Sequence, residues 1–148
     1  RARGGACELL IVGAGMWTAN ETPHEGVHYA GRLGRKELAQ VMRGAKGLVF
    51  VPWFEGFGVP IVEAFASGVP VIASNTTAMP EVCGGAAAAL VDPANANEIA
   101  EAMKQLESDG ALRNRCVKAG LKRAKEFSWD ASARRLMGSI EAVFTGHA

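Results

Sequence analysis

The sequence has few of the features that mark disulfide-rich, metal-binding or membrane proteins. Its three cysteines, Cys7, Cys83 and Cys116, are far apart and form no Cys-x-x-Cys pair. Such isolated cysteines indicate reduced thiols in the core rather than a disulfide framework or a zinc site. No apolar run reaches the roughly 20 residues of a membrane span, and no signal-type apolar segment follows Arg1. We therefore expect a cytoplasmic protein.

An excess of charge of one sign is also absent. The 16 Lys and Arg residues and 15 Asp and Glu residues give a formal net charge of +1. No basic run is interleaved with aromatic residues. Because so small a charge does not attract nucleic acid, we exclude nucleic acid as a partner.

The rest of the composition is that of a globular domain. Apolar residues make up 49% of the 148 residues and charged residues 21%, which excludes general disorder. A chain of this length buries a core without disulfides or a structural metal. Because the sequence contains no repeat, low-complexity tract or linker, we expect a single domain over residues 1–148.

Short apolar runs that end at Gly or Pro predict buried strands. The expected strands span residues 8–12, 47–52, 69–74 and, more weakly, 88–91, with a further strand-like stretch at 27–29. Helices are expected between them at 35–44, at 60–67 and from Met79. Unalternating apolar strands indicate a parallel sheet that is covered on both faces. The alternation of strand and helix predicts an α/β, Rossmann-like fold.

The last third of the chain has a helical pattern. Apolar residues at helical spacing predict an amphipathic helix over residues 97–106, and two further helices are expected at 110–125 and 129–144. Ser128 is the expected N-cap of the last helix, with Asp130 in its first turn. We expect Trp129 to pack in the core beneath this helix.

The segment Glu55-Gly56-Phe57-Gly58 carries the strongest functional signal from the residues themselves. It follows a predicted strand and precedes a helix with Pro60 in its first turn. Open α/β sheets bind ligands at the carboxyl ends of their strands, and free amides at a helix N-terminus attract phosphate. The two glycines let a ligand approach the backbone donors. The loop is therefore a predicted ligand site.

Two carboxylates accompany this loop. Glu55 lies on it and Glu63 lies about one turn into the following helix, so both can face one ligand. Carboxylates make strong hydrogen bonds to hydroxyl groups, which suits a sugar and a ribose. The alternative is that Glu63 only complements the helix dipole and that Glu55 is a solvated loop residue. The residues alone leave both interpretations open.

An ordered series of motifs resembles a known family. It consists of Glu-Gly-Phe-Gly-x-Pro-x-x-Glu-Ala at 55–64, Ser-Gly-Val-Pro-Val-Ile-Ala at 67–73, Pro-Glu-Val at 80–82 and Phe-Ser-Trp at 127–129. This series is similar to the C-terminal domain of family 4 retaining glycosyltransferases (glycosyl transferases group 1) of the GT-B fold, and it covers nearly the whole chain. Within the family, residues 74–82 are most similar to bacterial mannosyl- and rhamnosyl-type transferases.

The resemblance implies roles for particular residues. Glu55 would contact hydroxyl groups of the donor sugar as the catalytic-site carboxylate, and Glu63 would bind the ribose of the nucleotide. The backbone groups of Gly56, Phe57 and Gly58 would meet the sugar and the diphosphate.

The resemblance also places Gly31 and Arg32 beside the nucleotide base. The family holds the donor diphosphate with an Arg and a Lys in a Gly-Arg-Leu…Lys-Gly stretch. Residues 31–36 contain a similar series of residue types, but they lie only one helix before the strand at 47–52. We therefore expect the diphosphate-binding pair to precede Arg1.

The activity implied is sugar transfer from a nucleoside-diphosphate sugar to an acceptor, with retention of anomeric configuration. The chain would be the donor-binding C-terminal half of a GT-B enzyme, lacking the N-terminal acceptor domain and the start of the donor domain, and inactive alone. No cofactor is expected. Because the sequence has no Asp-x-Asp spacing, charge stabilisation should be independent of metal.

Several other interpretations stay open at this point. A nucleotide-sugar epimerase of GT-B architecture and a non-catalytic nucleotide-binding module are the alternatives to a transferase. The acceptor, whether glycan, lipid or small molecule, is not indicated, and attachment to the inner membrane face would depend on the absent domain.

Four residues or short segments beside these motifs have simpler expected roles. Trp53 and Phe54 are expected to pack, with stacking on a sugar or base as the alternative. Gly13-Ala14-Gly15 indicates a tight turn rather than a dinucleotide site, because a third glycine is missing. Glu81 is expected at a helix N-terminus, where a carboxylate is favourable, with a contact to the donor as the alternative.

Overall fold

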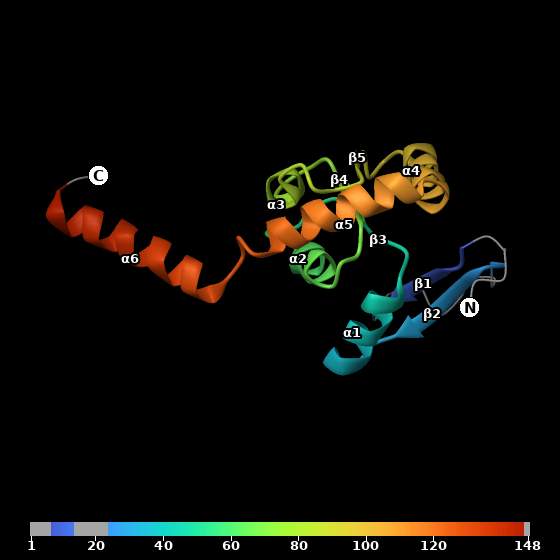
Figure 1. Ribbon diagram of the computed structural model, residues 1–148, viewed down its shortest axis with the longest axis horizontal. Coiled ribbons are helices and arrows are strands. Elements are labelled where there is room, and N and C mark those ends of the chain that lie inside the picture. Colours follow the sequence, from blue (N-terminus) through green and yellow to red (C-terminus); the bar gives the residue numbers. More distant parts are fainter. Residues whose placement is uncertain (1–6, 14–23, 147–148) are drawn as a thin grey trace. The chain divides into compact units, whose positions relative to one another are not determined.

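The computed structural model describes residues 7–13 and 24–146 (Figure 1). The strands are β1 (Leu9–Val12), β2 (Val27–Gly31), β3 (Leu48–Phe50), β4 (Val71–Ser74) and β5 (Ala89–Val91). The helices are α1 (Arg35–Gly44), α2 (Val59–Ala66), α3 (Met79–Cys83), α4 (Ala96–Ser108), α5 (Gly110–Ala124) and α6 (Trp129–Thr145). The chain divides into two compact units, Arg1–Val41 and Met42–Ala148. The single domain over residues 1–148 stays a prediction.

The first unit contains a parallel pair of strands. β1 and β2 pair from Leu9 opposite Val27 to Ile11 opposite Tyr29, and an irregularity follows before Val12. The four apolar residues of β1 are 37–43% exposed. The prediction of a buried strand here is wrong, because this pair has no third strand among the described residues and two strands cover little apolar surface.

The second unit contains a parallel sheet with the order β3-β4-β5. Alternate residues of β4 face opposite sides. Val71 and Ala73 lie in a cluster with Phe65 of α2 and Met79 of α3. Ile72 lies in a second cluster with Leu106 of α4. Helices thus cover both faces of this sheet, which confirms the predicted α/β class.

Helices α4, α5 and α6 begin at side-chain caps that the sequence encodes locally. Asn95 accepts a hydrogen bond from the Glu98 amide at α4 (3.2 Å), and Asp109 accepts one from the Leu112 amide at α5 (2.8 Å). Ser128 accepts one from the Ala131 amide at α6 (3.1 Å). The predicted N-cap of the last helix is confirmed.

Helices α2 and α5 pack closely because one position on α5 has no side chain. A Cβ atom added to Gly120 would lie 2.6 Å from Cδ1 of Phe65, which is fully buried. Only glycine lets the α5 backbone approach the Phe65 ring at this distance. This contact fixes α5 against the helix that follows the predicted site loop.

Helix α6 differs, since none of its residues is buried. Trp129, at its start, is 91% exposed. The prediction that Trp129 packs in the core is therefore wrong. The apolar residues of α6 have the helical spacing of a buried face, but no described element covers them.

Candidate functional site

The predicted site loop occupies the carboxyl-terminal edge of the three-stranded sheet. Residues 51–58 connect β3 to α2, and residues 75–78 leave the neighbouring strand β4 at the same edge, because the two strands are parallel. Ligands of open α/β sheets bind outside the carboxyl ends of the strands. The structure therefore places the Glu55–Gly58 segment where such a ligand binds.

Gly58 joins this loop to α2 in a way that only glycine allows. As the residue before the helix, it has a φ of 94°, in the left-handed region. A Cβ atom here would also lie 2.8 Å from Cε of Met79 in α3. With no side chain on Gly58, α2 begins without a side-chain cap. Of the positions that follow, Pro60 has no N–H and the Ile61 amide donates to the Gly58 carbonyl at 3.0 Å, so an acceptor at this helix start would meet the amide of Val59 and those of the loop before it.

Glu55 is half-buried within the loop, and its Oε1 atom accepts a hydrogen bond from the Gly56 amide at 3.1 Å. Glu63 is exposed and lies beyond the first turn of α2, which holds no acidic residue. Because the helix dipole acts mainly within the first turn, this position weakens the interpretation of Glu63 as a dipole partner. The ligand contacts of both carboxylates stay predictions.

The aromatic residues of the loop fall into two kinds. Phe57 contacts Phe127 edge to face, with ring centroids 5.7 Å apart and an interplanar angle of 83°. Trp53 and Phe54 are 70% and 80% exposed. The prediction that they pack is wrong, because β3 ends at Phe50 and these side chains lie beyond the sheet. Stacking on a sugar or base stays open.

The last residue of β4 and the loop after it hold polar groups that the sequence analysis did not single out. Ser74 is fully buried, and neither its Oγ nor the buried Oγ1 of Thr76 has a hydrogen-bond partner among the described residues. Thr77 has a φ of 53°, which is uncommon for a residue other than glycine. The sequence signal that could have identified these groups is the polar run at residues 74–77, which directly follows the apolar residues of β4. Glu81 lies in the first turn of α3, as expected.

Gly31 and Arg32, the residues expected beside the base, belong to the first unit. Gly31 ends β2 with a φ of 63°, and its carbonyl accepts a hydrogen bond from the Gly13 amide at 2.8 Å. Arg32 is exposed. Their contact with a base stays a prediction. Of the predicted turn at Gly13-Ala14-Gly15, only Gly13 is within the described residues.

The cysteines are only in part the core thiols that the sequence predicted. Cys83 and Cys116 are buried, which confirms the prediction for these two, but Cys7 is exposed. Burial raises the pKa of Cys83 to about 11, against a smaller lowering by Arg123. Burial likewise raises the pKa of Cys116. Both thiols therefore stay protonated at neutral pH, which makes them poor nucleophiles.

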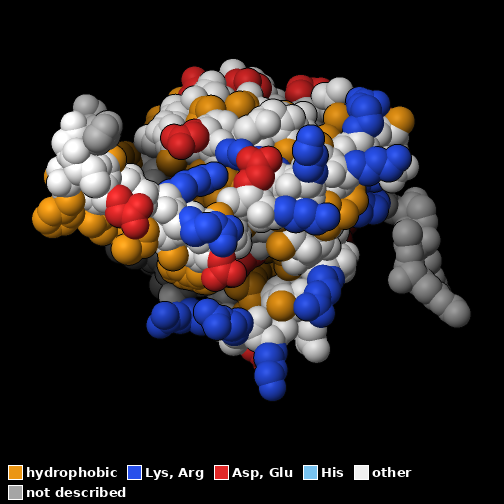
Figure 2. Space-filling model, turned by 60° about the vertical axis from the view of Figure 1, so that its left-hand side comes forward, with side chains coloured by type: hydrophobic (Ala, Val, Ile, Leu, Met, Phe, Trp, Pro, Cys, Tyr) orange, Lys and Arg blue, Asp and Glu red, His pale blue; other side chains and the backbone are white. Residues whose placement is uncertain are grey.

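Charged side chains of both signs are mixed on one face (Figure 2), and metal-binding side chains form no cluster among the described residues. On the face shown in Figure 2, acidic side chains are interspersed among Lys and Arg side chains. No group of three His, Cys, Asp or Glu residues within 7–13 and 24–146 is placed to hold a metal ion. Within the same ranges, no helix has the length and apolar character needed to cross a bilayer.

A family model described as glycosyl transferases group 1 matches residues 4–123. The chain belongs to this family. It is 36% identical over 104 residues to O-antigen chain mannosyltransferase B of Escherichia coli, covering 70% of this chain and 27% of that protein. It is also 36% identical over 118 residues to the MMP alpha-(1->4)-mannosyltransferase of Mycolicibacterium hassiacum, covering 78% and 29%. The predicted likeness to mannosyltransferases is confirmed.

A solved structure shows the same fold. The sucrose-phosphate synthase of Thermosynechococcus elongatus matches 82% of this chain and 31% of its own, with a TM-score of 0.68 and 28% identity. The chain thus spans less than a third of the length of these relatives. The roles of individual residues are not tested by these similarities and stay predictions.

Proposed function

We propose that this chain forms the donor-binding part of a retaining glycosyltransferase, which transfers a sugar from a nucleoside-diphosphate sugar to an acceptor. The observation that carries the proposal is the start of α2. There a helix N-terminus without a side-chain cap follows a glycine of left-handed conformation at the carboxyl edge of a parallel sheet, with one carboxylate on the loop before the helix and one on the helix itself. Membership of the glycosyltransferase family supports it.

In this proposal each part of the site meets a different part of the donor. Glu55 accepts hydrogen bonds from hydroxyl groups of the sugar, and Glu63 accepts them from the ribose. The backbone groups of Gly56, Phe57 and Gly58 meet the sugar and the diphosphate. Trp53 and Phe54, which are exposed at the start of the loop, offer apolar faces to the sugar or the base.

The chemistry proposed is charge stabilisation without a metal ion. As the sugar leaves, negative charge grows on the diphosphate, and preoriented amides and cationic side chains stabilise that charge. Holding donor and acceptor close together in a fixed orientation supplies the rest of the acceleration. Because the chain spans under a third of its relatives, we assign acceptor binding to residues outside it.

Calorimetry with UDP, GDP and ADP tests the donor site. Glu63→Gln should weaken binding of the preferred nucleotide about tenfold, because a charged acceptor is lost. Glu55→Gln should leave nucleotide affinity nearly unchanged and weaken only the added contribution of the sugar in the matching nucleotide sugar. Glu101→Gln, an exposed carboxylate on α4, is the matched control. If neither loop variant differs from the control, the assigned roles are wrong.

The retaining transfer needs the full-length protein. Incubated with the nucleotide sugar and candidate acceptors, it should consume donor only when an acceptor is present and yield a product of the donor's anomeric configuration. Conversion of donor without acceptor would instead indicate an epimerase, and binding without conversion a regulatory module. Addition of EDTA should not change the rate if the reaction is independent of metal.

A further inference from the structure

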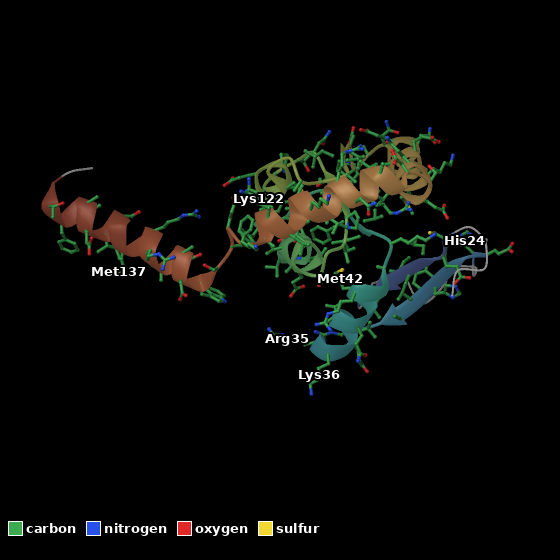
Figure 3. The ribbon with its side chains drawn as sticks, viewed as in Figure 1. His24, Arg35, Lys36, Met42, Lys122 and Met137 are labelled. Atoms are coloured by element: carbon green, nitrogen blue, oxygen red, sulfur yellow. The ribbon has the colours of Figure 1, made fainter. Side chains whose placement is uncertain are left out.

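Arg123, near the C-terminal end of α5, joins this helix to α3. Its Nε atom donates a hydrogen bond to the Val82 carbonyl at 3.0 Å, and its Nη2 atom donates one to the Glu81 carbonyl at 2.6 Å. Its Nη1 atom pairs with the Glu126 carboxylate. The last carbonyls of a helix have no partner within the helix. Arg123 supplies partners for those of α3, while its neighbour Lys122, labelled in Figure 3, is exposed.

The space for the Arg123 side chain depends on a glycine. Gly84 follows α3 with a φ of 52°, and a Cβ atom there would lie 2.6 Å from Nε and 2.8 Å from Cζ of Arg123. Glycine is thus needed both for the left-handed turn that ends α3 and for the close approach of the guanidinium. This geometry holds the guanidinium in one place.

Phe127 extends this contact to the site loop. The Cζ atom of Arg123 lies 4.8 Å from the centroid of the Phe127 ring, a cation-π distance. The Phe127 ring in turn contacts Phe57 edge to face. Phe127 is partly buried against the main core cluster. A continuous series of side-chain contacts therefore runs from the α3 carbonyls through Arg123 and Phe127 to Phe57.

We propose that Arg123 and Phe127 are positioning residues, which hold the Glu55–Gly58 loop in its binding arrangement. The loop is fixed at two points, and both lead to α3. Gly58 packs against Met79 at the start of α3, and Phe57 is held through Phe127 and Arg123 to the end of α3. Because Phe57 and Gly58 are consecutive residues, these contacts set the backbone at this end of the loop without a ligand. The consequence for donor affinity rests on the proposed function.

Calorimetry on the 148-residue chain tests this proposal with the nucleotide, UDP, GDP or ADP, that the wild type binds. Phe127→Leu removes the ring and its edge-to-face contact, so the Kd should rise roughly threefold to tenfold. Phe127→Tyr keeps the ring and should stay within about twofold of the wild type. Arg123→Lys keeps the charge but loses the planar fork that reaches both carbonyls, and should act in the same direction as Phe127→Leu.

Met103→Ala is the control for a general loss of stability. Met103 packs in the second core cluster, on the other face of the sheet, whereas Phe127 packs against the main cluster. Thermal unfolding of Phe127→Leu and Met103→Ala establishes how much stability each variant has lost. If Phe127→Leu weakens nucleotide binding no more than Met103→Ala does, or if Phe127→Tyr is as weak as Phe127→Leu, the positioning role is wrong.

Hydrogen exchange without ligand separates this proposal from the proposed function. The amide of Ile61, which donates a hydrogen bond to the Gly58 carbonyl at 3.0 Å, should exchange at least several times faster in Phe127→Leu than in the wild type, and should not change in Met103→Ala. If the wild-type chain binds none of the three nucleotides, the donor site fails, but faster exchange at this amide still supports positioning. Unchanged exchange overturns positioning whatever the nucleotide result.

Discussion

Helices α5 and α6 follow each other in the chain and begin in the same way, yet they differ in what they bury. Each starts at a polar cap, Asp109 for α5 and Ser128 for α6. Helix α5 buries Cys116 and Gly120 and packs against α2, whereas α6 buries none of its residues. A helical pattern in the sequence thus establishes that a helix forms but not that it is covered, since burial requires a partner surface.

The largest expected effect comes from removing the ring that packs on α5. Phe65→Ala deletes a fully buried ring beside Gly120 and should lower the free energy of unfolding by about 3–5 kcal/mol. Phe144→Ala on α6 removes a ring that is 86% exposed and should change it by less than about 0.5 kcal/mol. Urea denaturation of both variants measures the difference. Equal losses would show that α6 is covered after all.

Replacing glycine by alanine should be unfavourable in α5 and favourable in α6. Gly120→Ala places a Cβ atom against the fully buried Phe65 ring and should destabilise the protein by about 1–2 kcal/mol, even after the helix-propensity gain. Gly138 lies in α6 with nothing within 4 Å of an added Cβ, so Gly138→Ala should raise the helix content. Thermal unfolding and circular dichroism measure the two effects. A stabilising Gly120→Ala would contradict the close packing of α5 on α2.

The smallest expected difference in stability is between removing the N-cap of α5 and removing the N-cap of α6. Asp109→Ala removes the acceptor of the Leu112 amide and should lower the free energy of unfolding by about 1 kcal/mol. Ser128→Ala removes the acceptor of the Ala131 amide, but because α6 buries nothing, only local fraying should increase. Amide exchange of Leu112 and Ala131, combined with urea denaturation, separates local from global effects. A global loss in Ser128→Ala equal to that in Asp109→Ala would contradict the comparison.

The local parts of the fold were predictable from the sequence. The parallel strands of the second unit, the helices and the Ser128 cap depend on apolar runs, helical spacing and capping residues within a few positions of one another. Gly58 could be identified because the glycine stands between a strand and a Pro-containing helix start. These features predicted the α/β class and the place of the site loop at the sheet edge.

Burial and long-range contacts were not predictable in the same way. Trp53, Phe54 and Trp129 are large apolar residues of the kind found in protein cores. They are nevertheless exposed, because no described element lies over them. The contact of Phe57 with Phe127 joins residues that are 70 positions apart, and no local pattern connects them. Phe127, the first residue of the Phe-Ser-Trp motif, was indicated only by the family resemblance, and it contacts the site loop.

The hydrogen bonds of Arg123 also bear on the order in which the protein folds. They connect α5 to carbonyls 41 and 42 positions earlier in the chain. Contacts across so long a separation cost chain entropy before they add stability, so they form late in folding. We expect the Glu55–Gly58 loop to reach its final arrangement after the β3-β4-β5 sheet. Substitution of Phe127 should therefore change the unfolding rate and leave the folding rate nearly unchanged, which is a kinetic φ-value near zero. The part of the molecule that would bind the donor is then the last to be completed.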